Sequence, residues 1–236
     1  MKKTETMPFV FEPSAPPGVP VNGEHALFPV RRIFCVGRNY AEHAEEMGAD
    51  PQRDPPFFFS KPADAAVING LDIPYPPATS NLHHEVELVI AIGTAGANIP
   101  AQSALNHVYG YAVGNDLTRR DLQAEAKKSG RPWDTAKGFD QSAPIANISP
   151  VSLCGHIKSG RISLRVNGEQ RQRGDIADMI WSVAEIISTL SALFTLQPGD
   201  LIFSGTPAGV GPLEPGDQVD AFIEGLSPLS HKVVAS

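Results

Sequence analysis

The clearest hydrophobic pattern in the chain is a pair of apolar segments in its first half. Residues 86–92 are mostly β-branched and aliphatic, which predicts a strand. Glu85 and Glu87 stand two positions apart at its start, and side chains two apart on a strand share a face. Residues 108–113 predict a second strand, and Asp116 follows its end. The pattern therefore places three carboxylates at strand ends.

These carboxylates form a candidate metal site. Like charges repel, and the free-energy cost rises when water is excluded, so a cation is the simplest remedy. Three hard oxygen ligands without cysteine fit Mg²⁺ or Mn²⁺. The alternative is an acidic strand edge that faces solvent. His83 and His84 come just before the strand, but their spacing to the glutamates is poor for tetrahedral zinc.

A candidate general base follows the first predicted strand of the body, residues 28–37. Asn39 is a plausible N-cap for the helix that comes next, and Gly48 is a plausible C-terminal residue. His43 and Glu46 lie three apart on one face of this helix. A carboxylate fixes the tautomer of a histidine and stabilises its imidazolium, as a general base requires. The alternative is an ordinary pair on a surface helix.

Two lysines stand in segments of unusual character. Residues 56–62 predict a short aromatic strand that ends at Lys61, for which a lysine extending its charged end to solvent is the alternative. Residues 131–145 show no regular periodicity, and Lys137 lies in their middle. Loops of that length inside a compact domain are often functional.

A further helix is predicted between these segments, with Thr118 as its N-cap. Arg120 and Gln123 share one face of it, close to Asp116. In the last third, Asn167 and Gly168 predict a two-residue hairpin turn.

Residues 176–196 have helical periodicity with charged and hydroxyl side chains, so they predict a core helix and not a membrane span. Residues 198–226 predict two strands joined by a glycine-rich loop that contains Thr206. Glycines let the backbone approach a ligand, and their N–H groups can hold a carboxylate or phosphate. No nucleotide-binding glycine motif is present.

The composition describes an ordinary folded protein. With 236 residues, 42% hydrophobic and 19% charged, the chain can bury a substantial core. A net charge of -7 argues against a nucleic-acid surface and against adhesion to anionic membranes. Residues 1–28 are rich in proline and predict an extended arm, followed by one domain over 29–236. The N-terminus lacks the apolar region of an export signal and two cysteines make no disulfide framework, so we expect a cytoplasmic protein.

Seven motifs, in this order, resemble the fumarylacetoacetate hydrolase family: GRNYAEHAEEMG, PFFFSKP, LHHEVELVIAIG, GYAVGNDLTRRDLQ, GRPWDTAKGFDQSAPI, VNGEQRQ and LIFSGTPAGVGPLEPGD. The likeness is greatest to its small acylpyruvate hydrolases. It implies an α+β fold, with a mixed β-sheet roll and flanking helices, a homodimer, and a bound Mg²⁺ or Mn²⁺.

The resemblance also implies roles for individual residues. The metal ligands correspond to Glu85, Glu87 and Asp116, and the catalytic residues correspond to His43, Glu46 and Lys137. The substrate-binding positions correspond to Arg38, Lys61, Arg120, Gln123 and Thr206. Close relatives often carry an apolar residue in place of Asn115.

The reaction implied is hydrolysis of a carbon–carbon bond in a 2,4-diketo acid, with fumarylpyruvate as the expected substrate in the degradation of aromatic compounds. The same fold also serves oxaloacetate decarboxylation, isomerisation of hydroxymuconate-type diacids and sugar-acid dehydration. A pair of His43 and Glu46 favours hydrolysis, because decarboxylation needs no activated water. A non-catalytic module that binds a metal or a ligand is an alternative of another class.

Overall fold

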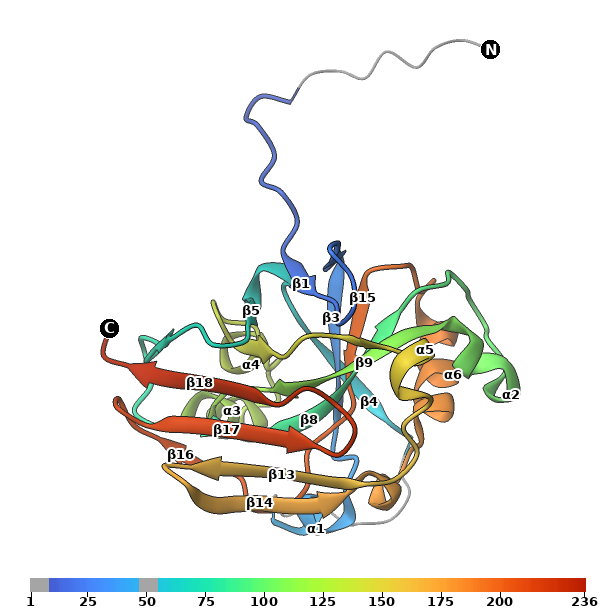
Figure 1. The fold of residues 1–236 in the computed structure, drawn as a ribbon. Helices are drawn as coiled ribbons and strands as arrows, with labels where there is room; N and C mark the ends of the chain where they lie inside the picture. The colour runs from blue at the N-terminus through green and yellow to red at the C-terminus, as the bar shows by residue number, and fades with distance from the viewer. Residues whose placement is uncertain (1–8, 47–54) are drawn as a thin grey trace.

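A mixed sheet runs through the centre of the protein (Figure 1). The computed structural model describes residues 9–46 and 55–236, apart from the side chains of residues 44–46. In spatial order the central sheet consists of β4 (Phe57–Lys61), β3 (Arg32–Gly37), β15 (Asp200–Phe203), β8 (Val86–Ile92), β9 (Val108–Asn115), β11 (Ala143–Ile145) and β5 (Ala66–Ile68), and β12 (Ser149–Pro150) pairs with β9. The sheet is mixed because β15 runs parallel to β3 and antiparallel to β8.

A second sheet packs over one side of the central sheet, as the gold and red strands of Figure 1 show. Its strands are, in spatial order, β14 (Glu169–Asp175), β13 (Arg161–Val166), β17 (Gln218–Ile223), β18 (Leu229–Val234) and β6 (Ile73–Pro74). A small sheet joins β10 (Thr118–Arg119), β7 (Leu82–His84) and β16 (Gly211–Leu213). Curled sheets with a few helices confirm the predicted α+β roll.

Strand β8 divides the core into two hydrophobic clusters. Val86 and Leu88 belong to the larger cluster, which β13 and β17 complete from the second sheet. Val89 belongs to the smaller cluster on the other face of the central sheet. Alternate side chains of a strand point to opposite faces, so both faces of β8 are buried and all seven of its residues are inaccessible. Glu85 and Glu87 fall on the Val89 face, as the two-residue period predicts.

The helices lie around these sheets. They are α1 (Ala41–Glu46), α2 (Ala101–Ala104), α3 (Arg120–Lys128), α4 (Asp134–Lys137), α5 (Val151–Cys154) and α6 (Val183–Leu193), with single 3-10 turns at η1 (Ala63–Ala65), η2 (Leu105–His107) and η3 (Ile176–Asp178). Helix α6 covers the larger cluster through Ile186, Ile187 and Leu190. None of the helices in the described ranges is long and apolar enough to cross a membrane.

The predicted helix over 176–196 is wrong at its start. Residues 176–178 form a 3-10 turn, and the helix begins only at Val183. Ser182 accepts a hydrogen bond from the backbone N–H of Glu185, and the Glu185 carboxylate accepts one from Ser182, so a capping box fixes this beginning. Met179 is extended instead, where it pairs with Tyr40.

Two predicted N-caps are also wrong. The buried Asn39 side chain donates to the carbonyls of Trp181 and Ser204 and accepts from the Trp181 N–H, so it joins three separate segments. Thr118 lies in β10, and Arg119 is the N-cap of α3 without a side-chain capping bond. The Asn39 side chain makes contacts distant in sequence, whereas the Thr118 hydroxyl donates to the Asp116 carbonyl at 3.0 Å, so neither side chain caps a helix.

Part of the proline-rich N-terminal arm packs on the body of the protein. Within the arm, β1 (Gly18–Pro20) and β2 (Leu27–Pro29) form an antiparallel hairpin whose Val19 and Phe28 join the smaller cluster. The strand predicted over 28–37 is therefore two strands with different partners. Residues 9–17 lead away from the body in Figure 1.

Two loop predictions have different outcomes. Asn167 and Gly168 join β13 to β14 with φ values of 54° and 81°, so the predicted hairpin turn is confirmed. The irregular segment 131–145 contains the short helix α4 and strand β11, which were not predicted. Lys137 ends α4 and is buried there.

Gly114 of β9 is expected to be intolerant of a side chain. A Cβ atom at this position would lie 2.5 Å from both Val89 Cγ2 and Phe203 Cε1. We expect Gly114→Ala to lower the free energy of unfolding by about 1–3 kcal/mol, because overpacking forces neighbouring side chains and strands to shift. Urea unfolding would measure this loss. Gly168→Ala, where no atom lies within 4 Å of the added Cβ, serves as a comparison for backbone strain alone. An unchanged midpoint for Gly114→Ala would contradict the packing.

Candidate active site

Three buried carboxylates meet where β8 begins and β9 ends. Glu85 precedes β8, Glu87 lies within it, and Asp116 follows β9. Because the strands are antiparallel, the Asp116 N–H donates to the Glu85 carbonyl at 2.8 Å, which draws the two ends together. One oxygen from each side chain lies within 4.8 Å of the others, and none of the three residues is more than 4% exposed. A solvent-facing acidic edge is therefore excluded.

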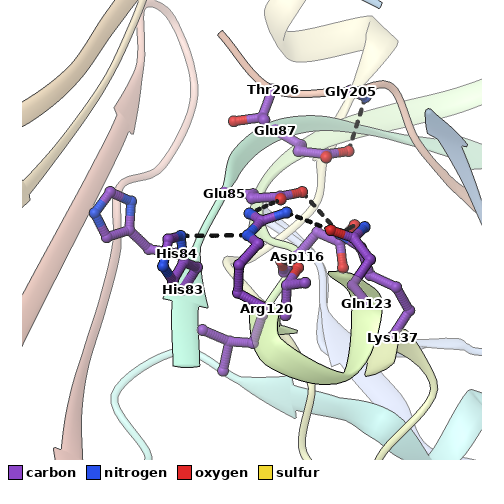
Figure 2. Close-up of polar contacts among 12 residues, drawn as sticks. His83, His84, Glu85, Glu87, Asp116, Arg120, Gln123, Lys137, Gly205 and Thr206 are labelled. Carbon is purple, nitrogen blue, oxygen red and sulfur yellow. Dashed lines mark hydrogen bonds and ion pairs between the residues drawn. The ribbon is translucent and has the colours of Figure 1, made fainter. Parts of the chain in front are cut away.

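Three cations pair with Glu85 and Asp116 of this acidic cluster, and two of them, Arg120 and Lys137, are labelled in Figure 2. The Nζ atom of Lys137 lies 2.8 Å from Glu85 Oε2 and 2.7 Å from Asp116 Oδ2. Lys61 Nζ lies 2.8 Å from Asp116 Oδ1, and the Arg120 guanidinium pairs with Glu85 Oε1. Buried charges are costly unless they are paired. These ion pairs therefore compensate the negative charges of Glu85 and Asp116.

Glu87 is held differently. Its side chain accepts a hydrogen bond from the backbone N–H of Gly205 at 2.8 Å, and no cation of the described residues pairs with it. Burial raises the pKa of Glu87 well above its ordinary value, and the neighbouring Asp116 and Glu85 raise it further. Burial favours the neutral form of Glu85 too, but Lys137 holds the pKa of Glu85 well below its usual range. Within the described residues, no cation therefore balances a negative charge at Glu87.

The donor set fits a hard divalent cation. Carboxylate oxygens are the ligands that Mg²⁺ and Mn²⁺ prefer, and a cation beside Glu87 would supply the missing charge. The nearby Cys35 thiol is buried, which raises its pKa well above the ordinary value, so it offers no thiolate. Glu85, Glu87 and Asp116 would thus hold the ion.

Ion binding is expected to depend on pH through Glu87. A raised pKa means that protons compete with the ion for this carboxylate, so affinity should rise with pH, by up to about tenfold per unit while Glu87 is protonated in the free protein. Calorimetric titration with Mn²⁺ at pH 5.5, 6.5 and 7.5, in buffers of different ionisation enthalpy, would measure affinity and proton release together. Equal Mn²⁺ affinity at all three pH values, with no proton release, would contradict the competition between protons and the ion at Glu87.

A small cavity opens over the acidic cluster. Its lining consists of Val36, Gly37, Arg38, His43, Phe57, Phe59, Glu85, Glu87, Asp116, Arg120, Gln123, Lys127, Trp133, Lys137 and Thr206. Most of the residues singled out from the sequence therefore share one cavity. Among the predicted site residues whose side chains are described, Lys61 lies outside this lining, because its fully buried side chain pairs with Asp116 and donates to the Leu117 carbonyl.

His43 lies in this cavity from helix α1. It is 6% exposed, and its charge acts on Glu85, so the imidazole is close to the acidic cluster. Glu46 ends α1, but its side chain lies outside the described residues. The pairing of these two side chains remains a prediction.

Neither histidine before β8 joins the acidic cluster. His83 hydrogen-bonds with Asn81 and accepts from Arg120, while the His84 ring contacts Gln172 at 2.9 Å. Burial lowers the pKa of His83 to about 4, and burial also lowers the pKa of His84. These residues support the site as neutral hydrogen-bonding groups.

Gln172 is a supporting residue that the sequence did not reveal. From β14 its amide donates to the Thr206 hydroxyl and the Pro207 carbonyl, each at 2.8 Å, and accepts from the Val86 N–H at 3.0 Å. Thr206 in turn donates to the Val86 carbonyl at 2.7 Å. The Thr206 hydroxyl therefore fixes the glycine-rich loop to β8. The sequence of β14 is polar throughout, so only the structure, which buries Gln172 alone of its glutamines, reveals this role.

Asn115 supports the cluster from the other side. Its Oδ1 accepts from the Glu85 N–H at 2.8 Å, so its amide nitrogen faces His231 Nε2 at 3.0 Å. Burial lowers the pKa of His231 to about 4, which keeps this acceptor neutral. Asn115 thus links the start of β8, at Glu85, to His231 of β18.

Comparison with known proteins identifies the family. The family model described as fumarylacetoacetate (FAA) hydrolase C-terminal matches residues 32–234. A crystal structure of fumarylpyruvate hydrolase from Pseudomonas aeruginosa, in complex with Mn²⁺ and pyruvate, is 53% identical, with a TM-score of 0.95 over 97% of this chain and 100% of that chain.

Two further relatives widen the range of activities. A putative fumarylpyruvate hydrolase from Burkholderia cenocepacia is 53% identical, with a TM-score of 0.91 over 98% of this chain and 100% of that one. A mitochondrial oxaloacetate tautomerase of Mus musculus is 43% identical over 206 residues, 87% of this chain and 93% of its own. The chain belongs to the fumarylacetoacetate hydrolase family, and it is an enzyme of that family with a carboxylate site suited to a divalent metal.

Proposed function

We propose that the protein hydrolyses the C3–C4 bond of a 2,4-diketo acid, and that fumarylpyruvate is its substrate, with fumarate and pyruvate as products. The observation that carries the proposal is the meeting of three acidic ligands, a buried histidine and a buried lysine in one cavity. Similarity to a fumarylpyruvate hydrolase over nearly the whole chain supports the choice of substrate.

The ion held by Glu85, Glu87 and Asp116 would act as a Lewis acid toward the 2-keto acid end of the substrate. His43 lies in the same cavity and would take a proton from the water that attacks C4. Glu46, three residues later on α1, would hold the imidazole in the required tautomer.

Two residues would stabilise charge at C4. Lys137 and Gln123 both line the cavity and are at most 3% exposed. Addition of water puts negative charge on the C4 oxygen, and buried donors stabilise such charge most strongly. The C3–C4 bond then breaks, its electron pair passes to the pyruvate fragment as an enolate, and a proton added at C3 completes pyruvate.

Lys61 is proposed to act through Asp116 and not on the substrate. Its side chain is fully buried and lies 2.8 Å from Asp116 Oδ1. It would hold this carboxylate oriented toward the other two of the acidic cluster.

A panel of substrates tests the proposal. Purified protein with Mg²⁺ or Mn²⁺ would be assayed with fumarylpyruvate, acetylpyruvate, fumarylacetoacetate and oxaloacetate, by loss of diketone absorbance and by pyruvate formation. We expect the highest kcat/KM for fumarylpyruvate. Equal or faster turnover of acetylpyruvate would replace this substrate with acylpyruvates in general.

Oxaloacetate is the second candidate substrate, because the mouse relative acts as an oxaloacetate tautomerase. Enolisation or decarboxylation of oxaloacetate would use the same three carboxylates but no attacking water. Faster turnover of oxaloacetate than of any diketo acid would establish this alternative. Tight binding of diketo acids without any turnover would indicate a binding module.

A further inference from the structure

Two cations of the cavity wall have no carboxylate partner among the described residues. Arg120 and Lys137 are paired with the acidic cluster. Arg38 and Lys127 line the same cavity, and neither takes part in an ion pair within the described ranges. Buried or half-buried charge is costly unless it is compensated, so this part of the wall favours an anion.

An aromatic pair brings these two cations together. The rings of Phe57 and Trp133 meet edge to face with centroids 5.2 Å apart. Arg38 Cζ lies 5.5 Å from the Phe57 centroid, and Lys127 Nζ lies 5.4 Å from the Trp133 centroid. Burial lowers the pKa of Lys127 to about 8, and Arg38 is the largest charged contributor, which agrees with their proximity. Each cation is thus held on its own ring, facing one space.

The backbone at Arg38 is also unusual. Its φ is 59°, in the left-handed region that residues with a side chain rarely adopt. The Phe57 ring packs against Gly37, where a Cβ would lie only 2.0 Å from the ring. Strained backbone of this kind persists where surrounding structure over-determines it, and it is concentrated at ligand-binding sites.

Helix α3 sets the distance between the two ends of the cavity. Arg120, Gln123 and Lys127 follow one another at helical spacing on one face, and all three line the cavity. Seven residues of helix separate the α-carbons of Arg120 and Lys127 by about 10 Å. In an extended seven-carbon chain the two terminal carboxyl carbons lie about 7 Å apart, at roughly 1.2 Å per bond. The Lys127 side chain is long enough to span the difference between this length and the helix segment of about 10 Å.

We propose that Lys127 and Arg38 form a subsite for a second carboxylate, so that the cavity selects seven-carbon 2-oxo acids that end in a distal carboxylate. The inference rests on the proposed function for the location of the 2-oxo acid end. It assigns the distal group to Lys127 and Arg38, because Arg120 already donates to Glu85, Gln123 and His83.

Two unreactive ligands test the subsite without turnover. 2-Oxoheptanedioate and 2-oxoheptanoate have equal chain lengths and no 4-keto group, and they differ only in the distal carboxylate. Calorimetric titration into the Mn²⁺-loaded protein is expected to show about ten- to a hundredfold tighter binding of the diacid, as one charge-assisted contact supplies.

Three variants assign that preference to a residue. Lys127→Met should reduce the preference for the diacid over the monoacid to less than about threefold. Lys127→Arg should retain most of this preference, which would show that the positive charge of the side chain, and not its shape, is responsible. The neighbouring, exposed Lys128→Met is the matched control and should leave it unchanged. Equal affinities in the wild type, or an undiminished preference in Lys127→Met, would overturn the subsite. A preserved preference in a protein that hydrolyses no diketo acid would uphold the subsite and reject the proposed reaction.

Discussion

Replacing any one of Glu85, Glu87 and Asp116 by its amide is expected to lower kcat/KM by at least about a thousandfold. Each carboxylate contributes one oxygen to a cluster only 4.8 Å across, and an amide offers a weaker ligand without charge. Loss of Lewis-acid stabilisation is worth several kcal/mol, and each 1.4 kcal/mol is about tenfold in rate. Steady-state assays with fumarylpyruvate, together with Mn²⁺ titration, would measure both losses.

The matched control is Glu169→Gln, because this glutamate is exposed on β14 and pairs with the exposed Arg171. It should leave both activity and Mn²⁺ affinity unchanged. Glu87→Gln is the most informative variant of the three, since no cation in the described part of the chain pairs with Glu87 and would be left buried and unpaired. Full activity of Glu87→Gln, or of the wild type after treatment with a chelator, would contradict the metal site.

Replacing His43 by glutamine is expected to lower hydrolysis of the diketo acid by roughly 10²–10⁴-fold, the usual contribution of a general base. Glu46→Gln should lower it less, because Glu46 is expected only to orient the imidazole. Mn²⁺ affinity should stay the same in both variants, and any turnover of oxaloacetate should change far less, because it needs no attacking water. Parallel assays of both substrates would separate these effects.

The control for this pair is His25→Gln, an exposed histidine remote from the cavity lining. It should retain both activities. Hydrolysis that survives His43→Gln within a factor of a few would show that another group activates the water. Equal loss of both activities would instead assign His43 to a step that the two reactions share.

The local sequence was enough to predict the ligand-bearing strands. A period of two placed Glu85 and Glu87 on one face, and the end of the second apolar segment placed Asp116 beside them. The prediction of a curled mixed sheet came from the resemblance to the family and not from hydrophobic periodicity. Pairing of β8 with β15, more than a hundred residues later, depends on side-chain packing that no local pattern reports.

Supporting contacts were the main omission. Gln172 reaches Thr206 and Val86 from a strand that the sequence describes only as polar. Asn39 was predicted as a cap because its chemistry suits a helix start, but its amide satisfies Trp181 and Ser204 instead. Buried polar groups take whichever partner the tertiary structure provides, so their roles require the fold.

Lys127 illustrates the same limit within the active site. Its position seven residues after Arg120 could have indicated the cavity-facing side of α3. What the sequence could not show is that Arg120 is already committed to Glu85, whereas Lys127 is not paired among the described residues. Whether a cationic side chain is available to bind a ligand depends on the carboxylates that distant strands place beside it.

Hydrolysis in ¹⁸O-labelled water tests the central claim most directly. If water adds at C4 before the C3–C4 bond breaks, fumarate from fumarylpyruvate should carry one solvent oxygen in the carboxylate formed from C4, and the pyruvate carboxylate should carry none. Mass spectrometry of both products would locate the label. Fumarate without label, or release of CO₂ in place of fumarate and pyruvate, would contradict hydrolysis at this site.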